Sequence, residues 1–175
     1  GLGDVYKRQS KGLELAKKLS SPSIVITELL YARGFAIESL GDLEGALAEY
    51  TNGLEVAESL NNKKHVAMGL TNLGAIYYLT EKFEQALTVF NDALVLSADV
   101  DDDELKGYVS AELGILYSHL GQTEKSMSFY QKSYEYYQQA GKIFYAYNSL
   151  RNIAFNHSAN ERYDEAIVLY KEIID

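Results

Sequence analysis

The feature that most constrains the fold of this chain is a pattern that returns every 40 residues. One column of the pattern holds small residues, and three others hold an aromatic residue, a second small residue and a polar turn. The columns are Gly34, Gly74, Gly114 and Ala154; Tyr50, Phe90, Tyr130 and Tyr170; Ala46, Ala86, Ser126 and Ala166; and Gly41-Asp42, Glu81-Lys82, Gly121-Gln122 and Glu161-Arg162. Because four columns in phase require a repeated structural unit, the pattern predicts an array of stacked repeats.

Each repeat is predicted to consist of two helices, an A-helix followed by a B-helix. In the second repeat, apolar residues recur with the 3.6-residue period of an amphipathic helix over about residues 64–79 and again over 83–96. The short turn between the two favours an antiparallel hairpin. Small residues at the Gly74 and Ala86 columns allow two backbones to approach closely, and the Phe90 column fills the space beside them. We therefore expect seven consecutive helices and no strand after an initial helix tail.

The repeats are predicted to cover residues 23–62, 63–102, 103–142 and 143–175, after a partial repeat at 10–22, so that residues 10–175 form a single array. Residues 1–9 are interpreted as a sequencing-adapter scar. The run Asp4-Val5-Tyr6-Lys7-Arg8-Gln9 matches the in-frame translation of a transposase end sequence used to prepare sequencing libraries, which points to a metagenomic fragment. The last repeat stops within an apolar-periodic helix without a cap signal, so we interpret the array as truncated there.

These residues resemble the tetratricopeptide repeat family. Its pattern of a Leu-Gly pair, a tyrosine three residues after the glycine and then Ala-x-x-x-Phe is matched by Leu73-Gly74, Tyr77, Ala86 and Phe90. The resemblance covers about residues 10–175 and implies an all-α fold, a right-handed α–α superhelix of antiparallel helix hairpins. The period of 40 departs from the usual period of about 34, and the family's tryptophan and closing proline are absent. The chain thus resembles the 40-residue variety found in bacterial regulators, light chains of motors and polarity adaptors.

The charge of the chain argues against two classes of partner. The formal net charge is −9 and the pI is about 4.8. A negative surface repels phosphate backbones and anionic lipid surfaces, so we expect no nucleic-acid partner and no direct membrane contact from this fragment. The chain has no cysteine, which excludes disulfides and thiolate chemistry and fits either a reducing or an oxidising compartment.

No pattern of catalytic or cofactor-binding residues is present, so we expect neither an enzyme nor a cofactor. The three histidines, His65, His119 and His157, fall at different repeat positions, and no metal-binding or phosphate-binding motif occurs. The acidic run from Asp99 to Glu104 lacks the central glycine and the final glutamate of a calcium loop. We interpret it as carboxylates that cap the N-terminus of the following A-helix.

The family resemblance implies that A-helices line a concave groove in which a peptide binds. The residues that the repeat positions assign to this groove include Tyr31, Asn72, Tyr78, Tyr108, Glu112, Arg151 and Asn152. Asn72 and Asn152 share one repeat position, where related arrays use asparagine to bind an extended peptide backbone; the alternative is an exposed amide without a partner. A tyrosine-rich stretch at residues 134–147 packs between repeats or forms a second docking patch.

The sequence is compatible with two functions. The first is a protein- or peptide-binding scaffold. The alternative is the sensory or regulatory repeat region of a larger bacterial signalling protein whose kinase, cyclase or transcriptional output domain is missing. The truncated end predicts, in addition, self-association through apolar residues such as Ile167, Val168, Ile173 and Ile174.

Overall fold

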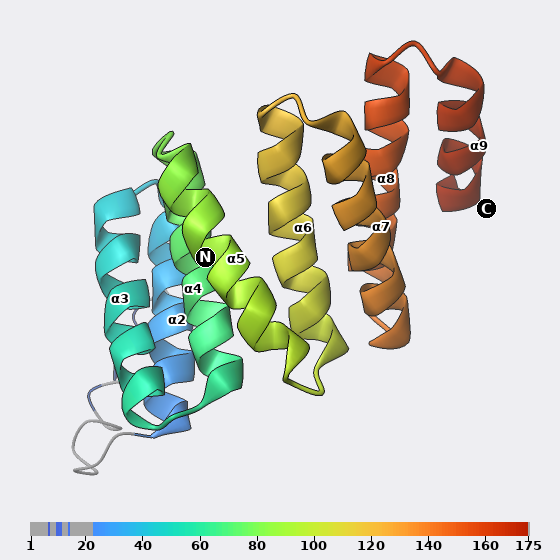
Figure 1. The fold of residues 1–175 in the computed structure, drawn as a ribbon. Helices are drawn as coiled ribbons and strands as arrows, with labels where there is room; N and C mark the ends of the chain where they lie inside the picture. Colours follow the sequence, from blue (N-terminus) through green and yellow to red (C-terminus); the bar gives the residue numbers. More distant parts are fainter. Residues whose placement is uncertain (1–6, 8–9, 12–13, 15–22, 175) are drawn as a thin grey trace. The chain divides into compact units, whose positions relative to one another are not determined.

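The structure is a computed structural model, and it describes residues 7, 10–11, 14 and 23–174 (Figure 1). The predictions for residues 1–9 and for the partial repeat at 10–22 therefore lie almost entirely outside the described residues. The described helices are α2 (Ile24–Glu38), α3 (Leu43–Ser59), α4 (Lys63–Leu79), α5 (Phe83–Ala98), α6 (Asp103–His119), α7 (Thr123–Gln139), α8 (Ile143–Ala159) and α9 (Tyr163–Ile174). The described residues contain no strand, as expected.

The number of helices differs from the prediction. Eight described helices follow residue 23, in place of the expected seven. The last repeat contributes both of its helices, and α9 reaches Ile174 even though it has only 12 residues. The A-helices are thus α2, α4, α6 and α8, and the B-helices are α3, α5, α7 and α9.

The turns inside the helix pairs share one backbone conformation, which explains their column in the sequence. The first turn residue has a positive φ in every pair: 87° at Gly41, 59° at Glu81, 70° at Gly121 and 61° at Glu161. The residue after each of these donates its amide hydrogen back into the last turn of the A-helix, as Lys82 N does to Tyr77 O at 2.8 Å. This left-handed cap stops the helix and reverses the chain in two residues.

The repeating glycines mark the places where the helices of a pair approach most closely. A Cβ atom added to Gly34, Gly74 or Gly114 would overlap the ring of Tyr50, Phe90 or Tyr130, respectively. Each ring belongs to the B-helix of the same pair and is buried, Phe90 completely. The predicted role of these two columns in hairpin packing is confirmed.

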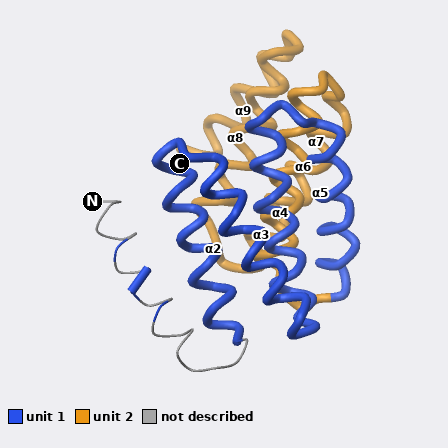
Figure 2. The backbone as a smooth tube through the Cα atoms, turned by 90° about the vertical axis from the view of Figure 1, so that its left-hand side faces the viewer, with its two compact units in different colours: residues 1–99 blue, residues 100–175 orange. Residues whose placement is uncertain are grey.

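The chain divides into two compact units, which Figure 2 shows in different colours. Unit 1 comprises residues 1–99, whose described helices are α2–α5, and unit 2 comprises residues 100–175 with α6–α9. In unit 1, apolar residues of α2, α3 and α4 form one core around Tyr31, Tyr50 and Ile76. In unit 2, Tyr130 of α7 joins Leu150 and Ile153 of α8.

Candidate functional site

The seven predicted site residues all lie on A-helices, three in unit 1 and four in unit 2. Their accessibility differs, which decides which of them a partner can reach. Tyr31 is buried; Asn72, Tyr78, Tyr108, Glu112 and Asn152 are half-buried; and Arg151 is exposed.

Tyr31 belongs to the core of unit 1, which corrects its assignment to an open groove. Its side chain is 5% exposed, and its ring fills the space that Gly53 of α3 and Gly69 of α4 leave open. Its hydroxyl donates a hydrogen bond of 2.8 Å to the carbonyl oxygen of His65. Burial, with a smaller effect of Glu58, raises the pKa of Tyr31. A ligand cannot reach this ring unless α2 and α4 separate.

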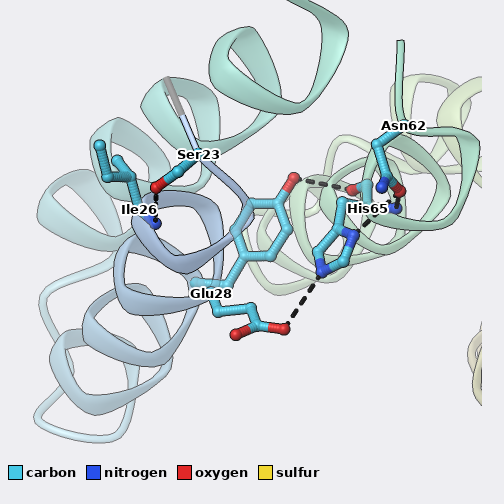
Figure 3. A network of polar contacts seen from close by, with 6 residues as sticks. Ser23, Ile26, Glu28, Asn62 and His65 are labelled. Atoms are coloured by element: carbon cyan, nitrogen blue, oxygen red, sulfur yellow. Dashed lines mark hydrogen bonds and ion pairs between the residues drawn. The ribbon is translucent and has the colours of Figure 1, made fainter. Parts of the chain in front are cut away.

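The contacts of His65 explain why Tyr31 is held in this way (Figure 3). The ring nitrogen Nδ1 of His65 lies 3.0 Å from Oδ1 of Asn62, the residue that caps α4. Nε2 of His65 lies 3.5 Å from a carboxylate oxygen of Glu28 on α2. Together with the Tyr31 hydroxyl, these contacts link the first turn of α4 to the middle of α2. These side chains therefore stabilise the packing of α4 against α2.

The accessible predicted residues of unit 1 are Asn72 and Tyr78, both on α4. Both are half-buried, and the ring of Tyr78 lies 6.1 Å from the ring of Phe83 at a tilt of 54°. This contact holds the aromatic ring at the end of α4 next to the turn into α5. The α4 surface thus offers an amide and an aromatic ring about one and a half helical turns apart.

Unit 2 holds the other four residues, Tyr108 and Glu112 on α6 and Arg151 and Asn152 on α8. Two contacts tie these helices to one another: Ser118 Oγ donates to Asn156 Oδ1 at 3.2 Å, and Lys142 Nζ lies 2.8 Å from a Glu104 oxygen. The ion pair with Glu104 raises the pKa of Lys142. Side-chain contacts thus link the two A-helices near their beginnings and near their ends.

The α8 helix has an exposed face on which Arg151, a predicted groove residue, lies between two aromatic side chains. Phe144 and Phe155 are 73% and 61% exposed and lie seven residues before and four after Arg151, on the same side of the helix. Arg151 is also the only Asp, Glu, Lys or Arg residue in α8. The spacing of 144, 151 and 155 was a usable signal, but repeat columns alone did not separate exposed aromatic residues from packed ones.

The tyrosine-rich stretch divides between packing and exposure. Tyr137 is buried, and its ring stacks on Tyr145 with centroids 5.2 Å apart. Tyr134 donates its hydroxyl to Glu172 of α9 at 3.2 Å. Tyr145 and Tyr147 remain 49% and 36% exposed. The first part of the stretch therefore packs between helices, as one of the two interpretations expected, while the start of α8 leaves aromatic rings on the surface.

The acidic run before α6 caps that helix, as predicted. Asp102 is the N-cap residue, and its carboxylate accepts a hydrogen bond of 2.9 Å from the amide of Leu105. Asp103 lies 3.2 Å from Lys106 in the same helix. Asp99 pairs with Lys63 at 2.7 Å, which lowers the pKa of Asp99. These carboxylates thus have partners within the protein.

Among the residues that the structure describes, no three His, Cys, Asp or Glu side chains gather closely enough to hold a metal ion. None of the helices from α2 to α9 combines the length and apolar character that crossing a membrane requires.

Comparison with known proteins agrees with this geometry. The model of the tetratricopeptide repeat family matches residues 26–98 and 65–139. A curated relative, outer dynein arm-docking complex subunit 4 of Mus musculus, is 25% identical over 116 residues, which are 66% of this chain and 18% of the relative. The chain therefore spans about a fifth of the length of this relative.

Two solved structures share the fold. One is a Rap protein complexed with Competence and Sporulation Factor, with a TM-score of 0.85, 14% identity and coverage of 98% of this chain and 46% of that one. The other is a signal transduction ATPase with a tetratricopeptide repeat sensor from Pyrococcus horikoshii, with a TM-score of 0.77, 21% identity and coverage of 96% and 26%. At these identities, the likeness shows the fold alone.

Proposed function

Since the chain belongs to the tetratricopeptide repeat family, we propose that each of its two units binds an extended segment of a partner protein on the accessible faces of its A-helices. The fold is a non-catalytic scaffold that is typical of protein–protein interaction. The proposal concerns the form of the ligand and the residues that bind it, Asn72 and Tyr78 in unit 1 and Tyr108, Glu112, Arg151 and Asn152 in unit 2.

The observation that carries the proposal is the position of Asn72 and Asn152. They occupy the same repeat position on α4 and α8, and both are half-buried at the surface. An amide side chain both donates and accepts hydrogen bonds, so it can bind a peptide N–H and C=O at once. An extended peptide offers such groups at regular intervals because its backbone is not paired within itself.

The neighbouring side chains supply the remaining contacts of such a ligand. Tyr78 in unit 1 and Tyr108 in unit 2 present aromatic surface beside polar groups, which suits apolar side chains of a peptide. The exposed guanidinium of Arg151 can bind one carboxylate through two parallel hydrogen bonds. Glu112 on α6 can accept hydrogen bonds or pair with a cationic residue.

Replacing Asn72 and Asn152 together tests this function. Random peptides are selected by display in parallel on the wild type, on the Asn72→Ala/Asn152→Ala variant and on Asn52→Ala/Asn91→Ala. The control pair lies exposed on the B-helices α3 and α5. Sequences enriched on the wild type and on the control are then titrated by calorimetry. We expect the double A-helix variant to lose about 1–3 kcal/mol of binding free energy, the scale of hydrogen bonds lost from a desolvated site.

Unchanged affinity in the A-helix variant would contradict the proposal and move the site elsewhere. The exposed rings of Tyr145 and Tyr147 would then be the next surface to test. Thermal unfolding of each variant serves as a control for folding, since neither asparagine belongs to a packing column.

A sensory role is a second proposal, supported by the neighbours of the fold. One neighbour is described as a tetratricopeptide repeat sensor within a signal transduction ATPase, and the Rap protein is seen with a bound signalling factor. The test is the full-length gene. A kinase, cyclase or transcriptional domain in the same reading frame would support a sensory region, and an array without one would oppose it.

Self-association is the third part of the proposal. The last described helix, α9, exposes Tyr163, Ile167, Val168 and Ile174. An apolar helix face in water favours association with a second apolar surface. Light scattering at increasing protein concentration tests it, and a monomer at all concentrations would oppose it.

A further inference from the structure

Unit 1 has an open pocket where α3 and α5 end and α4 begins. Its volume is about 360 Å³, and the described residues that line it are Glu58, Asn61, Lys63, Val66 and Leu96. They come from the last turn of α3, the turn after it, the first turn of α4 and the last turn of α5. Because α2 precedes these helices and α6 follows them, the pocket does not result from either end of the chain.

The pocket combines apolar walls with a polar rim. Val66 and Leu96 are half-buried, whereas Glu58, Asn61 and Lys63 are exposed. The volume lies at the lower end of the range for pockets that bind small ligands, about 300–1,000 Å³. The pocket can therefore hold one long side chain whose methylene groups contact apolar residues while its polar end group reaches the rim.

The charges around the pocket favour a cation. The carboxylate of Glu58 forms no hydrogen bond or ion pair with another residue that the structure describes. Lys63 lies 2.7 Å from Asp99, the C-cap residue of α5, so its charge is offset. Both α3 and α5 end at the pocket, and neither has a basic residue in its last turn. Because the C-terminus of a helix carries a partial negative charge, the pocket attracts a cationic group.

The equivalent positions of unit 2 contain a lysine of the chain itself. The residues 40 positions after Val66 and Leu96 are Lys106 of α6 and Tyr136 of α7. Nζ of Lys106 lies 5.7 Å from the centre of the Tyr136 ring and 3.2 Å from a carboxylate oxygen of Asp103. Only 19% of the Lys106 side chain is exposed. These repeat positions thus accept a lysine that packs on its neighbours and pairs with a carboxylate. In unit 1, the smaller residues Val66 and Leu96 leave an open pocket instead.

We propose that the pocket of unit 1 binds a lysine side chain of a partner protein. The methylene groups of this lysine contact Val66 and Leu96, and its ammonium group lies at Glu58 and the C-terminal end of α3. An ammonium group donates hydrogen bonds in three directions, which suits one carboxylate beside a helix end, whereas a planar guanidinium favours two parallel bonds to a carboxylate. The pocket is separate from Asn72 and Tyr78, so the inference does not rest on peptide binding there.

The first experiment titrates the full, isotopically labelled chain with lysine blocked as its N-acetyl methylamide. The methyl signals of Val66 and Leu96 are followed by NMR. We expect both signals to shift, with a dissociation constant on the order of one millimolar, the scale for a ligand of this size. The norleucine derivative keeps the methylene groups but lacks the ammonium group, and it is expected to bind at least about tenfold more weakly. The arginine derivative is also expected to bind more weakly than the lysine derivative.

The second experiment removes the charge at the rim. Glu58→Gln keeps the size of the side chain and is expected to weaken binding of the lysine derivative by about five- to tenfold. The matched control is Glu84→Gln, at an exposed position outside the pocket. Glu84 lies 12 residues before Leu96, about 18 Å along α5, where salt screens its charge. The control should therefore change the affinity by less than about twofold.

The third experiment fills the pocket with the residues of unit 2. The double substitution Val66→Lys/Leu96→Tyr gives unit 1 the pair that Lys106 and Tyr136 form in unit 2. We expect the lysine derivative to lose its binding, because the side chain introduced at position 66 occupies the pocket. The backbone amide signals of Asn61 then report binding, and circular dichroism checks that the helices are retained. If this variant does not fold, Glu58→Gln still decides the question.

Each contrary outcome overturns a defined part of the inference. Unchanged signals of Val66 and Leu96 overturn the pocket as a binding site, and shifts at Asn72 in their place would move the lysine to the A-helix face. Equal binding of the norleucine derivative, or equal losses in Glu58→Gln and Glu84→Gln, overturns the role of the rim charge. Arginine binding at least as tightly as lysine overturns the choice of lysine. Because the signals locate the ligand, failure here leaves the proposed peptide binding at Asn72 unaffected.

Discussion

Units 1 and 2 follow the same repeat pattern but fill it with different chemistry. In unit 1, the second small-residue column of the B-helices holds Ala46 and Ala86, both fully buried. In unit 2, the same column holds the buried Ala166 and also Ser126, whose hydroxyl donates to the carbonyl oxygen of Gly114 on α6 at 2.9 Å. Asn156 of α8 also donates to Ser126, at 3.0 Å. At one of the two positions of this column in unit 2, a buried polar network thus takes the place of the hydrophobic packing of unit 1.

The two units also differ in the length of the side chains that form hydrogen bonds between helices. The short buried hydroxyl side chains of unit 1 bond within their own helix, as Thr71 does to Ala67, and two long side chains, Tyr31 and Tyr50, make the hydroxyl bonds between helices. In unit 2 short side chains bridge helices: Ser133 donates to Gly107 O at 2.9 Å and lies 2.8 Å from Ser149 Oγ. Hydrogen bonds made by short side chains tolerate little displacement of the helices. The stability of unit 2 is therefore expected to depend more on hydrogen bonds, and the stability of unit 1 more on how well side chains fill the core.

The largest expected effect comes from overpacking unit 1. Gly74→Leu would overlap the ring of Phe90 and is expected to lower the free energy of unfolding by about 3 kcal/mol or more. Ala154→Leu is the matched change in unit 2, where the position already accommodates a Cβ atom, and should cost less. Denaturant unfolding gives the totals, and hydrogen exchange reports which helices lose protection. A larger loss at Ala154 than at Gly74 would contradict the comparison.

An intermediate effect is expected from the polar network of unit 2. Asn156→Ala removes the groups that bind Ser118 and Ser126 and should cost about 1–3 kcal/mol of stability. Changing Ser126→Ala and Asn156→Leu together gives these columns the apolar character that they have in unit 1. Because both partners become apolar, we expect the double variant to recover to within about 1 kcal/mol of the wild type. Additive losses in the double variant would show that the network is not the source of the effect.

The smallest effect concerns single tyrosine hydroxyls. Tyr31→Phe removes the bond to His65 O and is expected to cost about 1 kcal/mol in unit 1. Tyr137→Phe is the control in unit 2, because Tyr137 is equally buried and its hydroxyl bonds to no other part of the described chain. Its replacement should change the melting temperature less. Equal losses at the two positions would mean that removing any buried hydroxyl group, and not breaking the bond to His65 O, sets the cost.

The sequence by itself was sufficient to establish the helix hairpins. Helix periodicity, the turn column and the pairing of Gly74 with Phe90 depend on residues within one repeat, so their physical cause is local and visible in the chain. The capping role of Asp102 was predictable for the same reason, since a capping residue and the amide it binds are three residues apart. The residues of the candidate site could be placed on A-helices by repeat position alone.

Only the tertiary structure decided which of those residues a partner can reach. Tyr31 is buried because Gly53 and Gly69, on two other helices, leave room for its ring. Arg151, at the same repeat position, is exposed. Likewise, Asn156 is satisfied only because Ser118 and Ser126, 38 and 30 residues away, meet it in space. The helical period selects the side of a helix on which a side chain lies, but accessibility and polar partners depend on what distant segments bring against that side.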